Sequence, residues 1–316
     1  LTMGGAKFCR FALFPLMLLM LLLLPAGMVA QTEASSSKYI ATYESSTQTL
    51  TFKKLVGETL PGNSAWVEDK QTVTAINTKL GNGTIVHIVF DKSFSTYTPT
   101  SLYRFFEDLK KLETITGLEY LNTTNVKSMR QMFCSCRALT SLDITHLKTN
   151  TVTDMFAMFY NCGVSSLDLS NFNTENVTNM AYMFMMCNQL TWIDLSSFNT
   201  AKVEKMYGMF QYTAQLEHIY AKELFTTEQV INSNNMFNGC QNLPNFDFEV
   251  VDKTHANRFK DGYFEELVAK SGEERIGAVV DNGLTANHLN LNDDKDLYLF
   301  NNFVAKKAAY SRTMKE

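Results

Sequence analysis

Five Met-Phe pairs recur through the middle of this 316-residue chain at intervals of 26, 25, 26 and 27 residues. The pairs are Met132-Phe133, Met158-Phe159, Met183-Phe184, Met209-Phe210 and Met236-Phe237. A fixed period of this length is typical of repeat proteins, in which a core forms only where neighbouring repeats stack. We therefore expect function to reside on a surface of the stack and not in a pocket.

Within one repeat, two apolar patterns follow each other. The run Leu167-Asp168-Leu169-Ser170 alternates apolar and polar residues, which predicts a strand with one buried face. From Val177 to Cys187 the apolar residues are spaced by three and four, which predicts a short helix. The run from Cys187 to Leu195 has the L-x-x-L-x-L spacing of leucine-rich repeats. We therefore expect an α/β solenoid, a leucine-rich-repeat-like stack of short strands and short helices with small β-rich flanking segments.

Further columns recur in phase with the Met-Phe pairs. Shifted by 27 residues, Ile115, Met132 and Phe133 align with Ile88, Phe105 and Phe106, which predicts a diverged first repeat at residues 88–114. Its stretch from residue 99 to 112 is the better helix former and is expected to cap the stack. The repeated columns are Thr123, Thr149, Thr174, Thr200 and Thr227, then Val126, Val152, Val177, Val203 and Val230, and then Cys136, Cys162, Cys187 and Cys240, with Thr213 interrupting the last.

The consensus LDLSxFxTxxVxxMxxMF resembles the repeat of the BspA-type leucine-rich-repeat surface proteins. The resemblance covers residues 88–243. It implies a bacterial protein, secreted or displayed on the cell surface, that adheres to host or microbial partners. It brings no catalytic residues to this chain.

The first 30 residues predict export. A hydrophobic run at residues 8–29 follows Lys7, contains Arg10 and ends in small residues, which is typical of a secretory signal peptide cleaved after Ala30. The alternative is a retained membrane anchor, and we expect membrane contact only through this segment if it is uncleaved. The expected location is therefore secreted or cell surface.

Four regions are expected along the chain. Residues 1–30 form the signal peptide, residues 31–87 a β-rich lead-in, residues 88–243 the repeats, about six in number, and residues 244–316 a β-containing connector. Because the chain begins with Leu1 and stops abruptly at Glu316, we expect a fragment with a further C-terminal domain missing.

Composition and motifs argue against nucleic-acid binding and against enzyme activity. A formal net charge of −4 provides no basic field, so nucleic acid is not an expected partner. The five His are scattered, and no metalloprotease, nucleophile-elbow or phosphate-loop motif occurs. We therefore expect no enzyme activity, no cofactor and no metal site.

The cysteine column permits three interpretations. Side chains of one column point the same way, so a ladder of free buried thiols is favoured. Disulfides between repeats fit the parallel arrangement poorly, although an oxidising compartment would allow them. A zinc site is weaker still, because the pair Cys134 and Cys136 has no partner pair at ligand spacing.

Carboxylates recur on the predicted outer strand face at Asp143, Asp168 and Asp194. Two unit charges about 4.8 Å apart in water repel by roughly 0.8 kcal/mol, so something must offset the row. A row of bound cations is one interpretation. Hydrogen bonds to nearby Ser, Thr or backbone N–H groups are the favoured one, because one carboxylate per repeat is too few for Ca²⁺.

Aromatic residues gather at one end of the same face. We expect Trp192, His218 and Tyr220, rimmed by Asp168 and Asp194, to form a contact site for an extracellular protein or glycan. The competing interpretation is that the C-terminal segment folds back and buries these residues. Adhesion through the strand face is the predicted function; the alternatives are a structural spacer for a downstream domain and a scaffold for a missing enzyme domain.

Overall fold

The computed structural model describes residues 38–57, 59–257 and 262–265. The predicted signal peptide and most of the predicted connector lie outside these residues. The chain divides into two compact units, and the one described below begins at Lys38. Among the described residues, no helix is both long enough and apolar enough to cross a membrane.

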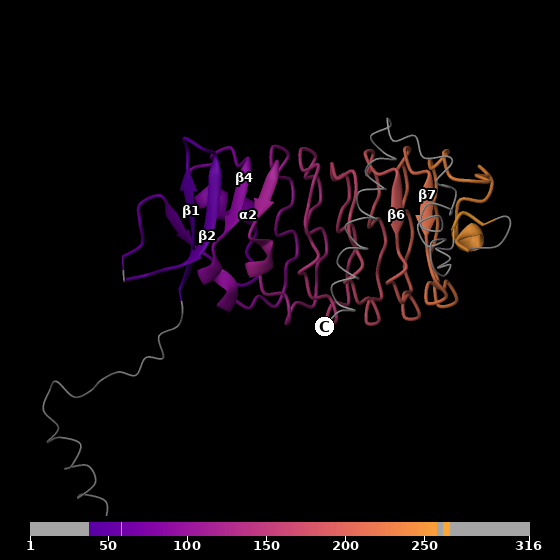
Figure 1. The fold of residues 1–316 in the computed structure, drawn as a ribbon, viewed down its shortest axis with the longest axis horizontal. Helices are drawn as coiled ribbons and strands as arrows, with labels where there is room; N and C mark the ends of the chain where they lie inside the picture. Colours follow the sequence, from indigo (N-terminus) through magenta and orange to yellow (C-terminus); the bar gives the residue numbers. More distant parts are fainter. Residues whose placement is uncertain (1–37, 58, 258–261, 266–316) are drawn as a thin grey trace, which may run out of the picture. The chain divides into compact units, whose positions relative to one another are not determined.

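A five-stranded mixed sheet begins the described chain (Figure 1). Its strand order is β3-β1-β2-β4-β5, with β1 antiparallel to β2 and β3, and with β2, β4 and β5 parallel. The register of β4 and β5 pairs Ile88 with Ile115, an offset of 27 residues. The strands are β1 Tyr39–Glu44, β2 Thr49–Lys54, β3 Ser64–Trp66, β4 His87–Phe90 and β5 Thr114–Thr116.

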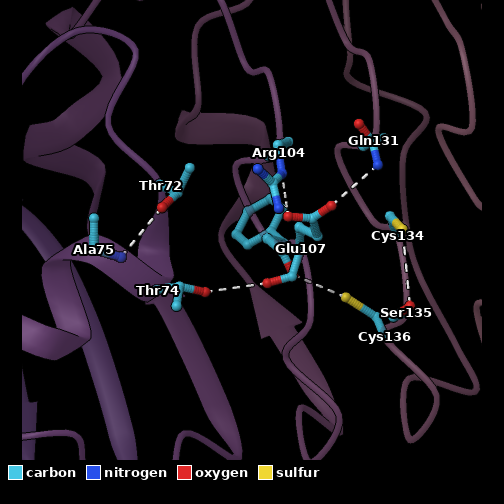
Figure 2. Close-up of polar contacts among 10 residues, drawn as sticks. Thr72, Thr74, Ala75, Arg104, Glu107, Gln131, Cys134, Ser135 and Cys136 are labelled. Atoms are coloured by element: carbon cyan, nitrogen blue, oxygen red, sulfur yellow. Dashed lines mark hydrogen bonds and ion pairs between the residues drawn. The ribbon is translucent and has the colours of Figure 1, made fainter.

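One short helix, α2 Val73–Lys79, packs against the first repeat. Thr72 caps its N-terminus by accepting a hydrogen bond from the Ala75 N–H at 3.1 Å. Its buried residues Val73 and Ile76 lie three positions apart on one helix face. Figure 2 shows how the Thr74 hydroxyl donates to the backbone carbonyl of Glu107, at 3.1 Å, which joins α2 to the repeat.

Each repeat forms one coil of the chain, and successive coils lie side by side (Figure 1). Single parallel bridges join Ser128 to Asp154, Asp154 to Asn179, Asn179 to Lys205, and Lys205 to Asn232. Two coils also pair through the parallel strands β6 Trp192–Asp194 and β7 His218–Tyr220. The remaining short elements are the 3-10 turns η1 Lys92–Thr96, η2 Leu118–Tyr120 and η3 Lys253–His255.

The expected α/β solenoid of strands and helices is wrong. Over the described ranges the sole α-helix is α2, which lies outside the coils, and the sheets have five and two strands. Neither sheet is curled or closed. The segments predicted as helices at residues 99–112 and 177–187 consist of turns, and the segment predicted as a strand at residues 167–170 does not form one.

These segments form turns and not helices because alternate backbone N–H groups donate to carbonyls of the next coil, and not to carbonyls four residues earlier in the same segment. In one coil the Met132 N–H donates to the Met129 carbonyl, whereas the Gln131 N–H donates to the Phe156 carbonyl of the next coil at 2.8 Å. Gln131 has a φ of 56°, as the third residue of a type II turn requires. Consecutive turns repeat an apolar position every three or four residues, as a helix does. The spacing alone therefore could not distinguish the two.

The Met-Phe pairs form the centre of the core. The rings of Phe106, Phe133, Phe159, Phe184, Phe210 and Phe237 stack from coil to coil with centroids 5.1–5.7 Å apart and interplanar angles of at most 12°. All six rings are fully buried. Burial of one such side chain contributes about 1.5–3 kcal/mol, so this column is a major source of stability.

Two polar columns bind each coil to a neighbouring one. The Thr174 hydroxyl donates to the Asn199 carbonyl at 2.8 Å and accepts from the Asn199 N–H at 2.9 Å. Thr123, Thr149 and Thr200 make the equivalent pair of hydrogen bonds. The buried threonine side chains thus satisfy partly buried backbone groups of the neighbouring coil.

The cysteine column consists of hydrogen-bond donors. The Cys187 thiol donates to the Phe159 carbonyl at 3.0 Å, and the Cys136 thiol makes the same contact with Phe106 (Figure 2). Thr213 keeps this contact, since its hydroxyl donates to the Phe184 carbonyl at 2.6 Å. All five cysteines of the described chain are free and buried, which confirms the predicted thiol ladder.

Residues after 243 close the far end of the core. The Phe237 N–H donates to the Val251 carbonyl at 2.9 Å, where a further coil would otherwise pair. The ring of Tyr263 packs edge-to-face on Phe237 with centroids 5.0 Å apart. Phe264 packs on the same ring, so the last member of the stack is shielded from water.

We expect Thr174→Val to lower the free energy of unfolding by about 1–3 kcal/mol, because the partly buried N–H and carbonyl of Asn199 lose the buried Thr174 hydroxyl as their partner. Denaturant unfolding followed by circular dichroism measures this change. The matched control is Thr178→Val in the same coil, which removes only a solvent-exposed hydrogen bond of 3.3 Å to the Thr153 carbonyl and should change stability by less than about 0.5 kcal/mol. Equal effects of both variants would contradict the role of the threonine column.

Burial raises the pKa of the thiols, to about 12 for Cys162 and Cys240, so they remain protonated and shielded at pH 8. We expect the cysteines from Cys134 to Cys240 to be unreactive toward a chromogenic thiol reagent in the native protein. In denaturant all five should react, counted on the chain without residues 1–30, which contain Cys9. Fewer than five reactive thiols after denaturation without reductant would indicate a disulfide.

Candidate binding surfaces

The carboxylates of the predicted strand face accept hydrogen bonds from residues two positions later in the chain. Asp143 Oδ1 accepts hydrogen bonds from the Thr145 N–H at 3.0 Å and the Thr145 hydroxyl at 2.7 Å. Asp194 Oδ1 accepts from the Ser196 N–H at 2.8 Å, and Asp168 makes the equivalent contact with Ser170. These bonds lower the pKa of Asp143 and offset repulsion along the row. The favoured interpretation, hydrogen bonding within the chain, is confirmed.

The predicted aromatic contact site is only partly on the surface. β6 and β7 bring its residues together, pairing Trp192 with His218 and Asp194 with Tyr220. Trp192 and His218 are half-buried, but Tyr220 is only 5% exposed. The expectation that Tyr220 forms an exposed anchor is therefore wrong, while Asp143, on an earlier coil, remains exposed.

The C-terminal segment is the physical reason for this burial. Glu265 forms a single parallel bridge with Tyr220, and its N–H donates to the Ile219 carbonyl at 2.8 Å, so this residue lies against β7. Burial raises the pKa of Tyr220, and the carboxylates of Glu265 and Asp194 add to the effect. For Tyr220, the alternative that the C-terminal segment folds back is correct.

An ion pair fixes the same segment. His218 Nδ1 lies 2.6 Å from Glu265 Oε1, with both side chains about a quarter exposed. The hydrogen bond with Glu265 raises the pKa of His218, against the opposing effect of desolvation. The pair thus ties β7 to the residues that close the core.

A second surface is formed by the turn residues 128–135, 154–161, 179–186 and 205–212, which we call the turn face. Three of its coils contribute half-exposed aromatic side chains, Phe156, Tyr182 and Tyr207. The ring centroids of Tyr182 and Tyr207 lie 4.8 Å apart at an angle of 90°, and those of Phe156 and Tyr182 lie 5.6 Å apart at 75°. The three rings therefore form one cluster across successive coils.

An arginine completes this cluster. The guanidinium carbon of Arg130 lies 3.7 Å from the centroid of the Phe156 ring, which is a close cation–π contact. Its Nη1 lies 3.7 Å from Asp154 Oδ2, so the guanidinium is oriented from two sides. We call Arg130, Phe156, Tyr182 and Tyr207 the aromatic patch.

Charged groups next to the patch are of both signs. On the preceding coil, Glu107 binds Arg104 and accepts a hydrogen bond from Gln131 Nε2 at 3.1 Å (Figure 2). On the other side, Lys205 is exposed. The surface therefore presents no extended field of one sign for a polyanion.

A shallow hollow of about 450 Å³ lies on another side of the coils, lined in part by Asn173, Asn199, Glu175 and Leu224. The amide oxygens of Asn173 and Asn199 accept hydrogen bonds from Glu175 and Ala201 within their own turns. Across the described ranges, no group of three or more His, Cys, Asp or Glu is placed to hold a metal ion. The aromatic patch is the stronger candidate binding surface.

Sequence reasoning missed the aromatic patch because its residues occupy different repeat columns. Phe156 and Tyr207 stand two positions after a bridge residue, whereas Tyr182 stands three positions after one. One signal was present in the sequence: Gly208 occupies the column in which Tyr182 stands. In the structure, the Tyr182 ring lies across the position that a side chain at Gly208 would take.

A family model described as "Mycoplasma protein of unknown function, DUF285" matches residues 89–191 and 142–250. The two overlapping ranges span just over half of the chain and include every coil with a Met-Phe pair. No curated protein and no solved structure matches the chain.

The ion pair predicts a pH-dependent contribution to stability. Because the folded state raises the pKa of His218, this contribution is present below the ordinary pKa of about 6.5 and is lost as pH rises through the folded value. We expect His218→Gln to destabilise the protein more at pH 6 than at pH 9, measured by thermal unfolding. The exposed His146→Gln is the control, and a pH-independent effect of His218→Gln would contradict the ion pair.

Proposed function

We propose that this chain, which belongs to the family described as "Mycoplasma protein of unknown function, DUF285", is a binding protein displayed outside the cell. The family description names no activity, so the proposal depends on the surface of the coils. In this proposal the chain adheres to an extracellular protein or glycan through that surface and catalyses no reaction.

The aromatic patch is the observation that carries the proposal. The coils are held together by the phenylalanine stack and by the hydrogen bonds of the threonine and cysteine columns, all inside the core. Phe156, Tyr182 and Tyr207 lie outside this interior and remain half-exposed. Tyrosine and arginine are enriched among residues that dominate binding energy at protein surfaces. Their clustering supports a recognition surface.

Two features of the sequence support the location. The hydrophobic run at residues 8–29 is typical of a signal peptide, and the repeat resembles that of the BspA-type surface proteins. Together they favour export and display at a cell surface.

A structural spacer is the second candidate function. Backbone hydrogen bonds join each coil to the next, for example from Phe133 to Met158 at 2.9 Å and from Phe159 to Met183 at 2.9 Å. Such coils would hold a downstream domain away from the cell without binding anything themselves. The two functions differ in whether surface substitutions affect adhesion.

We expect the protein to bind plates coated with laminin and type IV collagen, and Tyr182→Ala with Tyr207→Ala to weaken that binding about 30-fold or more. The matched control is Trp192→Ala with Asp194→Asn on the strand face. Plate binding over a concentration series measures the apparent Kd. Strong loss in the control alone would move the site to the strand face, and no binding by the wild type would favour the spacer.

A further inference from the structure

The Tyr182 ring lies where the next coil has a glycine, Gly208, and therefore no side chain. A Cβ at Gly208 would lie 2.3 Å from Cε1 and 2.4 Å from Cδ1 of the Tyr182 ring. Gly208 also has a φ of +58°, which favours glycine. The ring therefore lies across the position where a side chain of the next coil would stand.

A second small residue lets the outer rings meet. Phe156 and Tyr207 belong to coils that are not adjacent, because the coil containing Ala181 lies between them. Their centroids are nevertheless 6.4 Å apart, and the buried side chain of Ala181 is too short to separate them. Small residues at 181 and 208 thus allow three rings from three coils to close into one cluster.

Closure of the cluster makes it rigid before any partner arrives. Each ring contacts the other two, and the Arg130 guanidinium lies on the Phe156 ring. Side chains that are already ordered lose less conformational entropy on binding, which favours affinity. A rigid aromatic centre with charged groups of both signs around it is the usual arrangement of a protein–protein hot spot.

The ring geometry also distinguishes between partner classes. Stacking on a sugar ring requires an open aromatic face, but Arg130 lies on one face of Phe156, and the edge of one tyrosine ring, Tyr182 or Tyr207, meets a face of the other at 90°. The half-exposed cluster combines apolar ring surface with two tyrosines and a guanidinium that can form hydrogen bonds, which suit the apolar and polar groups of a folded protein surface. The mixed charges nearby give no preference for a polyanionic chain.

We propose that Arg130, Phe156, Tyr182 and Tyr207 form a preorganised hot spot for a folded protein partner, with Gly208 as a positioning residue for the Tyr182 ring. This inference rests on the proposed binding function and names the class of partner. Gly208 contributes by leaving space and makes no contact with the partner itself.

Gly208→Ala tests the inference without removing any residue of the patch. Its Cβ displaces the Tyr182 ring, and we expect binding to plates coated with native laminin and type IV collagen to weaken at least 10-fold. The control is Gly239→Ala, which also has a positive φ and places a Cβ 2.8 Å from a tyrosine ring, that of Tyr212 outside the patch. Equal loss in the two variants would overturn the positioning role.

Treatment of the coat distinguishes the partner classes. Binding to a folded protein should survive periodate oxidation of the coat and be lost after heat denaturation. The opposite pattern would overturn the inference in favour of a glycan while leaving the proposed binding function intact. No binding of the wild type to any coat would overturn both.

Folding of each variant is checked by circular dichroism and thermal unfolding. If Gly208→Ala does not fold, Tyr182→Leu provides the same test, because it keeps an apolar side chain beside Gly208 and removes the ring. We expect it to bind the native coat at least 10-fold more weakly than the wild type. Binding equal to the wild type would overturn the hot spot.

Discussion

The hydrogen bonds between coils are the interaction on which the rest of the structure depends. In each turn segment, alternate N–H groups donate to the following coil, as those of Gln131, Phe133 and Ser135 do. This pairing fixes the register, and the register places phenylalanine above phenylalanine at a stacking distance. It also places the threonine and cysteine columns where their side chains reach backbone carbonyls of neighbouring coils. A shift of register by one residue would disrupt all of these columns together.

A stack built in this way has two ends with unpaired groups, and each end is closed differently. At the start, the parallel strands β2, β4 and β5 continue the pairing into an antiparallel hairpin, and Phe90 meets the first stacked ring, Phe106, edge-to-face. At the other end, a folded-back segment places Tyr263 and Phe264 against Phe237. Terminal units with a different composition are a general requirement of repeat proteins, because an exposed apolar core at either end would promote aggregation.

The segment that closes the C-terminal end of the core covers part of the strand face and leaves the turn face open. The segment that shields Phe237 reaches β7 at Glu265, which bridges to Tyr220. The Glu265 carboxylate forms an ion pair with His218. Part of the strand face is thereby used to hold the chain together. On the turn face, small residues in two coils allow aromatic rings from their neighbours to gather at the surface. The proposed recognition surface is therefore the turn face.

Sequence periodicity by itself determined the coil length and the inward direction of the Met-Phe pairs, and it favoured the free thiol column, because each depends on residues that recur in phase. It also indicated that the aspartates bond within the chain. It could not distinguish turns from helices, because both repeat an apolar position every three or four residues and differ only in where the N–H groups donate. Only the tertiary structure decided the burial of Tyr220 and the closure of the aromatic patch. Both depend on contacts between residues in different coils or beyond the repeats, which no single repeat contains.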